Sequence, residues 1–188
     1  MIRLGLDSCQ APYLESWPLS TTTMASAPFD PGIFRQTLGR FATGITIVTA
    51  CDAQGSPHGL TVNSFTSVSL APPLVLFCIG KTSQSLESIM AANSFAINIL
   101  SAEQEVISTR FASRLESRFD GVDWVPGVTG SPLLAGALAT LDCRKHQTVE
   151  AGDHYILIGE VMATAFHDDA DPLLYFASKY RRLAPAAL

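Results

Sequence analysis

The sequence lacks most of the short motifs that mark common enzyme classes. Its 188 residues contain no G-x-S-x-G elbow and no H-E-x-x-H helix. No G-x-G-x-x-G follows a predicted strand, which argues against a Rossmann nucleotide site. The histidines lack the spacing of metal ligands; they are His58, His146, His154 and His167. Hydrolytic and metal-dependent catalysis are therefore unsupported, and we expect no metal site.

Basic clusters and cysteine pairs are also missing. The chain has 12 Lys+Arg against 17 Asp+Glu, a net charge of -5, and no basic block that could follow a nucleic-acid backbone. No C-x-x-C pair suggests zinc or a redox dithiol, and we interpret the cysteines as reduced thiols. They are Cys9, Cys51, Cys78 and Cys143. Reduced thiols favour a cytoplasmic protein.

Long apolar runs are absent as well. No stretch of 18 apolar residues exists, so the sequence offers no transmembrane segment. The opening "MIRLGLDSCQAPYLESWPLSTTT" is aperiodic, rich in Ser, Thr and Pro, and unlike a secretory signal. We expect residues 1–27 to be a disordered arm, or to precede a true start at Met24. Residues 28–188 are then expected to form one domain.

What is present is a hydrophobic content of 47%, arranged as short helices and many strands. "FDPGIFRQTLGRFATG" predicts an amphipathic helix that is capped by Asp30, has Pro31 in its first turn and ends near Gly44. Its apolar face comprises Ile33, Phe34, Leu38 and Phe41. A second helix is predicted to begin near Ser83. A capping-box pattern, Ser101 with Gln104, predicts a third helix running toward Arg110.

The strand-like segments are joined mostly by short turns. "GITIVTAC" and "PHGLTV" predict a hairpin around "DAQG", and "GALATLDCRKHQTV" and "HYILIGEVMATAFH" predict a longer hairpin around "EAGD". Further strands are predicted at "PPLVLFCIG", "SFAINIL" and "PLLYF". Such connections favour a mainly β, antiparallel sheet closed into a barrel, with helices at its ends.

Polar residues gather on both sides of the strand "PPLVLFCIG". They are Gly59, Thr61, Asn63, Ser64, Ser67 and Ser69 before it, and Lys81, Thr82, Ser83 and Ser85 after it. Hydroxyls and amides at a helix start suit a phosphate, and the Asn-Ser pair suits the polar edge of a ring, so a phosphorylated ring cofactor fits. The alternative is that these residues only cap the helix and alternate along an exposed edge. His58 and His154 could likewise be solvated turn residues.

At these residues the sequence resembles the flavin reductase family, which is related to the FMN-binding split barrels. The resemblance runs in order from about residue 30 to about residue 182. It is carried by "FRQTLGRFATGITIVTA", "GLTVNSFTSVSLAPPLVLFCI", "KTSQSLESI", "FAINIL", "RFASR", "GDHYILIGEV" and "PLLYFASKY". It implies a homodimeric split β-barrel that uses NADH or NADPH to reduce FMN or FAD and supplies the reduced flavin to a separate monooxygenase.

The resemblance also implies site residues. Flavin contacts would fall on Pro57, His58, Gly59, Leu60, Thr61, Asn63, Ser64, Cys78, Ile79 and Gly80. Phosphate-side contacts would fall on Gln84 and Ser85, with Arg110 and Phe111 as a further cationic and aromatic contact. The nicotinamide side would comprise His154, which we take as the catalytic residue, together with Tyr175, Phe176, Ala177 and Ser178.

Two other functions remain open on the sequence. One is an oxidase of the pyridoxamine-phosphate type, which would need clustered Arg and Lys around a second phosphate; basic residues are few between 57 and 120. The other is a non-catalytic flavin or haem carrier on the same barrel.

Overall fold

The computed structural model describes residues 29–184. The predicted disordered arm over residues 1–27, including the suggested start at Met24, lies outside the described residues. None of the helices within residues 29–184 is long and apolar enough to cross a bilayer.

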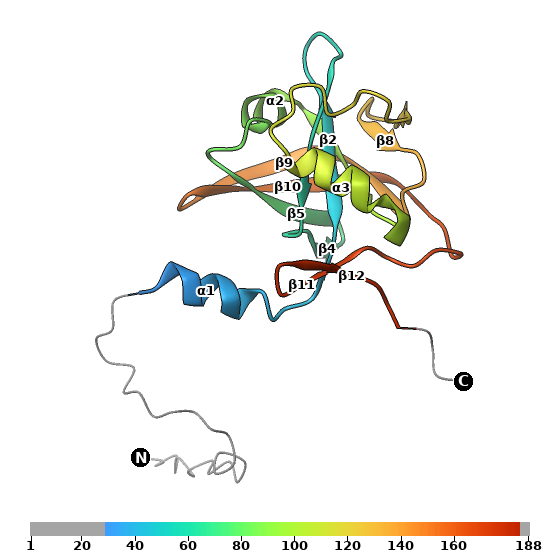
Figure 1. Cartoon of the computed structure of the whole chain (residues 1–188). Coiled ribbons are helices and arrows are strands. Elements are labelled where there is room, and N and C mark those ends of the chain that lie inside the picture. Colours follow the sequence, from blue (N-terminus) through green and yellow to red (C-terminus); the bar gives the residue numbers. More distant parts are fainter. Residues whose placement is uncertain (1–28, 185–188) are drawn as a thin grey trace, which may run out of the picture.

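One seven-stranded antiparallel sheet forms the body of the domain (Figure 1). Its strand order is β3-β2-β6-β9-β10-β5-β4. The strands are β2 (Thr46–Cys51), β3 (Pro57–Val62), β4 (Thr66–Leu70), β5 (Pro73–Gly80), β6 (Ser94–Ile99), β9 (Ala139–Ala151) and β10 (His154–Phe166). The predicted hairpins are confirmed as β2–β3 and β9–β10. The predicted mainly β, split-barrel fold with peripheral helices is confirmed.

Smaller elements surround this sheet. A three-stranded sheet comprises β1 (Thr43–Gly44), β11 (Leu174–Phe176) and β12 (Lys179–Arg181), and β7 (Trp124–Pro126) pairs with β8 (Pro132–Leu134). The helices are α1 (Pro31–Leu38), α2 (Leu86–Ala91), the 3-10 helix η1 (Ala102–Gln104) and α3 (Glu105–Ala112). The predicted capping box of Ser101 and Gln104 is confirmed.

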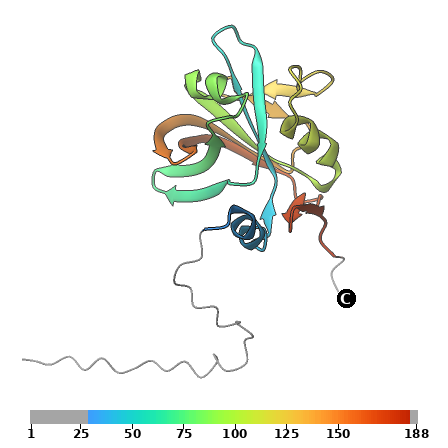
Figure 2. The same ribbon diagram turned by 60° about the vertical axis from the view of Figure 1, so that its left-hand side comes forward.

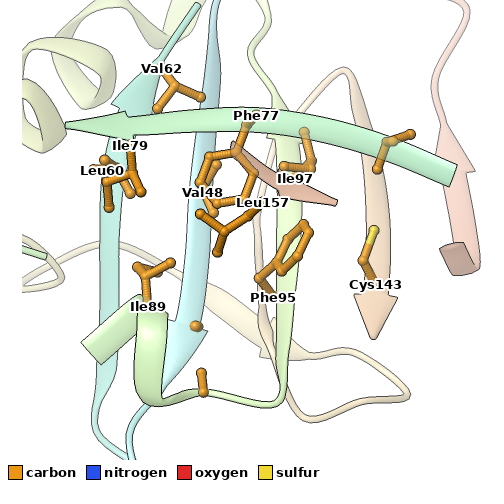
Figure 3. Close-up of a cluster of buried hydrophobic side chains, with 13 residues drawn as sticks. Val48, Leu60, Val62, Phe77, Ile79, Ile89, Phe95, Ile97, Cys143 and Leu157 are labelled. Atoms are coloured by element: carbon orange, nitrogen blue, oxygen red, sulfur yellow. The ribbon is translucent and has the colours of Figure 1, made fainter. Parts of the chain in front are cut away.

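The core fills the inside of the curved sheet (Figure 3). Phe77 of β5 and Phe95 of β6 meet edge to face, with ring centroids 5.1 Å apart. Leu157 of β10 and Val48 of β2 are fully buried beside them. Strand β5 alternates half-buried and buried residues, because successive side chains of a strand point to opposite faces. By the same alternation, the residues of β3 and its neighbouring segments that point away from the core are available to form a site.

Helix α1 differs from its prediction. Asp30 caps it as expected, with its carboxylate accepting hydrogen bonds from the N–H groups of Gly32 and Ile33. The predicted end near Gly44 is wrong: the helix ends at Leu38, because Thr43 and Gly44 pair with β11 instead. No residue of α1 is buried, and the helix stands outside the barrel in two views (Figures 1 and 2).

Two further local predictions need correction. Helix α2 begins at Leu86, not near Ser83, and has only six residues. The polar run before β5 contains an unpredicted edge strand, β4, which pairs with β5. Strand β4 (TSVSL) is mostly polar and exposed, so it has no strong hydrophobic period and the sequence pattern does not predict it.

Candidate functional site

Three cavities follow one another along β3 and the residues just after it. The His58 cavity, of about 240 Å³, is lined by Pro57, His58, Gly59, Gln84, Ser85, Ser88, Leu115, Glu116, Arg118 and Phe119. The Thr61 cavity, of about 260 Å³, is lined by Leu60, Thr61, Thr82, Ser83, Gln84, Phe111, Ala112, Ser113, Arg114 and Arg118. The Asn63 cavity, of about 720 Å³, is lined by Arg35, Leu38, Gly39, Phe41, Thr43, Asn63, Ser64, Phe65, Thr66, Tyr175 and Ser178.

Arg118 separates the first two cavities and lines both. Its Nη1 donates to the carbonyl of Gly59 and to Ser85 Oγ, each at 2.8 Å. Its Nη2 donates to Gln84 Oε1 at 3.0 Å and to the carbonyl of Ser113 at 2.7 Å. All four acceptors are neutral, and no ion pair among the described residues includes Arg118. The positive charge is therefore fixed in place without a counter-charge.

Arg118 is also partly buried and has one hydrogen-bond donor that is unused within residues 29–184. Burial lowers the pKa of the Arg118 guanidinium, since desolvation disfavours the charged form. Its Nε is buried and has no hydrogen-bond partner in the described part of the chain. Such groups are uncommon in folded proteins because an unpaired buried donor is costly. A half-buried cation held only by neutral groups is a fitting anchor for an anion.

The Thr61 cavity is polar and carries two arginines, Arg114 and Arg118. Its hydroxyl-bearing residues come from three segments: β3, the chain between β5 and α2, and the end of α3. Gly59 lets α3 pack closely here, because a Cβ at Gly59 would lie 2.8 Å from Cε1 of Phe111 and 2.9 Å from the carbonyl of Val48. The cavity can therefore receive a phosphate between hydroxyls and guanidinium groups.

The His58 cavity is walled by the ring of Phe119 and the side chain of Leu115, with polar groups around them. His58 is fixed from behind, since its Nε2 lies 2.9 Å from Oδ2 of Asp52. The hydrogen bond to His58 is the largest cause that lowers the pKa of the Asp52 carboxyl. The imidazole is thus held as a wall of this cavity.

The Asn63 cavity is the most apolar of the three and receives aromatic side chains from separate segments, among them Phe65 and Tyr175. Ser64 joins the segment after β3 to β5: its Oγ accepts from the N–H of Cys78 at 2.9 Å and donates to the carbonyl of Cys78 at 3.2 Å. Oγ1 of Thr43 is buried and makes no hydrogen bond to any of the residues that the structure describes. A flat ring with a polar edge matches this combination of walls.

The structure brings together most of the residues predicted for the site. Ile79 is an exception, because its side chain is 1% exposed and belongs to the core. Arg110 lies outside the three cavities and donates to the carbonyl of Asp120. Cys78 contributes through its backbone, and Gly80 pairs with His154 across β5 and β10. The remaining predicted residues outside the cavity walls are His154, Phe176 and Ala177.

His154 stands at the start of β10, about half exposed. Its Nδ1 lies 2.8 Å from Oδ1 of Asp153, and this hydrogen bond lowers the pKa of the Asp153 carboxyl. A Cβ at Gly80 would lie 3.5 Å from Nε2 of His154, an ordinary contact distance, so the imidazole lies beside the end of β5. Only the pairing of β10 with β5 brings this histidine close to residues 78–80.

Sequence reasoning missed Arg118 and Thr43. A signal for Arg118 existed, because the sequence contains three Arg-Phe pairs, Arg40-Phe41, Arg110-Phe111 and Arg118-Phe119. The sequence prediction uses only Arg110-Phe111 for the site. In the structure, Phe111 and Arg118 reach the cavities, while Arg110 points elsewhere. Only the packing of the segment after α3 against β3 decides between the two arginines.

Comparison with known proteins shows one consistent family. A family model described as "Flavin reductase like domain" matches residues 38–184. A probable flavin reductase of Rhizobium meliloti (strain 1021) is 49% identical over 140 residues, which cover 74% of this chain and 45% of the relative. The chain thus spans about half the length of that relative.

Two more similarities cover nearly the full length of the known protein. The reductase subunit of a flavin-dependent monooxygenase from Rhodococcus jostii (strain RHA1) is 40% identical over 162 residues, covering 86% of this chain and 83% of the relative. The structure of a Streptomyces globisporus NADH:FAD oxidoreductase, in complex with NAD and FAD fragments, superimposes with a TM-score of 0.79 at 42% identity. The match covers 86% of this chain and 99% of that one.

Proposed function

Since the chain belongs to the flavin reductase family, we propose that it uses NADH or NADPH to reduce FMN or FAD and supplies the reduced flavin to a separate monooxygenase component. The observation that carries this proposal is the succession of cavities along β3. The Asn63 cavity offers aromatic walls and a polar edge, and the Thr61 cavity, lined by residues just before Asn63 on the chain, offers hydroxyls and two guanidinium groups. A ring with a phosphate tail fits these two cavities, with the ring in the Asn63 cavity and the phosphate in the Thr61 cavity.

The residues of this chain would act mainly by binding and orientation. When bound, flavin and reduced nicotinamide would themselves supply the hydride-transfer chemistry, so the protein would need no side-chain nucleophile. Asn63 and Ser64 would hold the polar edge of the ring. Arg118 would hold the phosphate and keep the tail in place. Confining the reactants in this way replaces a bimolecular encounter by a prearranged contact.

A direct assay tests the proposal. Purified protein is mixed with NADH and either FMN or FAD, and the nicotinamide absorbance band is followed. Steady loss of the band, dependent on both flavin and protein, is the expected result. A carrier would bind flavin without consuming NADH, and an oxidase of the pyridoxamine-phosphate type would leave NADH untouched; either result contradicts the proposal.

A homodimer is part of the proposed function. Five large apolar residues around α1 are more than 45% exposed: Phe29, Ile33, Phe34, Leu38 and Phe41. Contiguous exposed apolar surface of this kind commonly marks an interface. Leu38 and Phe41 also line the Asn63 cavity, so a second copy seated on this surface would adjoin the proposed ring site.

We therefore expect sedimentation at micromolar concentration to give twice the chain mass of 20.1 kDa. Phe41→Glu should weaken association by about ten-fold or more, because it places a charge in a surface that must be desolvated. Val106→Glu is the matched control: Val106 is 76% exposed, close to the 77% of Phe41, but lies on α3. A wild-type monomer that still reduces flavin would refute the dimer.

His154→Ala tests the nicotinamide side. The imidazole stands beside Gly80, at the end of β5, and we expect its loss to raise the KM for the nicotinamide or slow hydride transfer by about ten-fold, a typical effect for one positioning contact. Flavin affinity should stay the same. The control is His146→Ala, an exposed histidine on β9 of the same hairpin. Equal loss of flavin binding in His154→Ala would indicate a structural role.

A cytoplasmic location is proposed with this function. Cys51, Cys78 and Cys143 are free thiols, which suit a reducing compartment. Burial raises the pKa of the Cys143 thiol to about 12, so this cysteine is an unreactive part of the core.

A further inference from the structure

The turn between β11 and β12 has an unusual backbone for its sequence. Ala177 and Ser178, which join the two strands, have positive φ angles of 50° and 60°. Hairpin turns of this kind are usually built from Asn and Gly, because the left-handed region disfavours other residues that carry a Cβ. Ser178 also lines the Asn63 cavity, so the turn forms part of the wall of the proposed ring site. A strained turn at this place needs surrounding contacts that hold it.

Backbone hydrogen bonds hold only one side of this hairpin. Strand β11 pairs with β1, and the N–H of Ala177 donates to the carbonyl of Gly39 at 2.8 Å. Strand β12 is the edge of its sheet, with β11 as its single partner strand within residues 29–184. Just past β12, Arg182 pairs with Glu103 at 2.8 Å, but both side chains are exposed and such a pair contributes little. The outer strand therefore depends on the buried side-chain contacts that it makes.

Tyr180 supplies such a contact from the middle of β12. Its hydroxyl lies 2.8 Å from Oγ of Ser108, a residue of α3 that is 0% exposed. Its ring meets the ring of Tyr175 edge to face at a centroid distance of 5.7 Å, and Tyr175 lines the Asn63 cavity. The carbonyl of Ser108 in turn accepts a hydrogen bond from Oγ1 of Thr61 at 2.7 Å. One buried serine thus joins the wall of the Asn63 cavity to the wall of the Thr61 cavity.

We propose that Tyr180 is a positioning residue for hydride transfer, and that its hydrogen bond to Ser108 fixes the β11–β12 hairpin against α3. This inference rests on the proposed function, because the walls of the ring site must keep the two reacting rings at contact distance. A misplacement of about 1 Å can cost about 100-fold in the rate of such a reaction. The phosphate end of the flavin is held elsewhere, since Tyr180 does not line the Thr61 cavity. The hydroxyl of Tyr180 therefore acts on the rate and not on flavin affinity.

Tyr180→Phe tests this role, because it removes one oxygen atom and keeps the ring. Single-turnover reduction of bound flavin at saturating NADH should be slower than in wild type by about ten-fold, while the flavin dissociation constant stays within about two-fold. Urea unfolding gives the folded fraction to which each rate is referred. Thr109→Ala is the matched control: it removes an exposed hydroxyl at the next position of α3, which donates to the carbonyl of Glu105 in the same helix, and should leave the rate unchanged.

Ser108→Ala removes the same hydrogen bond from the other side and covers the case in which Tyr180→Phe disturbs the fold. It should slow flavin reduction as much as Tyr180→Phe does, and the double variant should be no slower than either, because all three lose one and the same bond. Effects that multiply in the double variant would overturn the proposal. So would a Tyr180→Phe protein that unfolds at lower urea yet reduces flavin at the wild-type rate when folded; Tyr180 would then be merely structural, and the flavin reductase function would stand. A wild-type protein that leaves NADH unconsumed refutes both.

Discussion

Arg118→Leu is expected to weaken flavin binding by about 100-fold, or about 2.7 kcal/mol. The guanidinium borders the Thr61 cavity, where the flavin phosphate is proposed to bind, and no carboxylate within residues 29–184 forms an ion pair with it. A charge-assisted hydrogen bond contributes about twice as much as a neutral one, and a phosphate engages more than one donor. Loss of the whole group should therefore exceed the effect of any single hydroxyl in the cavity.

Two variants separate the charge from the framework that Arg118 supports. Leucine also removes four hydrogen bonds, to Gly59, Gln84, Ser85 and Ser113, so urea unfolding must accompany the titration. Arg118→Lys keeps the charge but not the planar fork, and should lose affinity by about ten-fold. If Arg118→Leu binds flavin as wild type does, the phosphate does not lie beside this residue. Arg110→Leu is the matched control, since Arg110 lies outside the cavities.

Phe77→Ala should have the largest effect on stability, a loss of about 3 to 5 kcal/mol in the free energy of unfolding. Phe77 is 0% exposed, and its ring packs edge to face against Phe95 inside the barrel (Figure 3). Alanine would leave a cavity that the surrounding strands cannot fill without breaking their hydrogen bonds. Since whole domains are stable by about 5 to 15 kcal/mol, this loss is a large fraction of the total.

Urea unfolding monitored by circular dichroism measures this loss. Phe166→Ala is the control: Phe166 is 71% exposed on β10, and its removal should change stability by about 0.5 kcal/mol or less. A Phe77→Ala protein with the midpoint of wild type would show that the centre of the barrel is not packed as described. Flavin affinity should follow the folded fraction, because Phe77 faces the core and not the cavities.

Local sequence patterns were sufficient wherever a single element satisfies its own hydrogen bonds. The cap of α1 at Asp30, the capping box at Ser101 and the two hairpins depend on neighbours in the chain, and all were predicted correctly. The end of α1 was predicted incorrectly. Residues 43 and 44 do not continue the helix because they pair with β11, which lies more than a hundred residues later in the chain. No local pattern contains that alternative partner.

By itself, the sequence determined the class of fold, through alternating apolar residues and short turns, and it predicted a common site for the polar residues between 59 and 69 and between 81 and 85. Tertiary structure alone decided which side chains reach that site. Ile79 turns into the core, Arg110 turns outward, and Arg118 crosses between Gly59 and Gln84 to divide two cavities. The physical reason is that strand pleat and loop packing fix the direction of each side chain, and a segment's composition does not record the direction in which it faces.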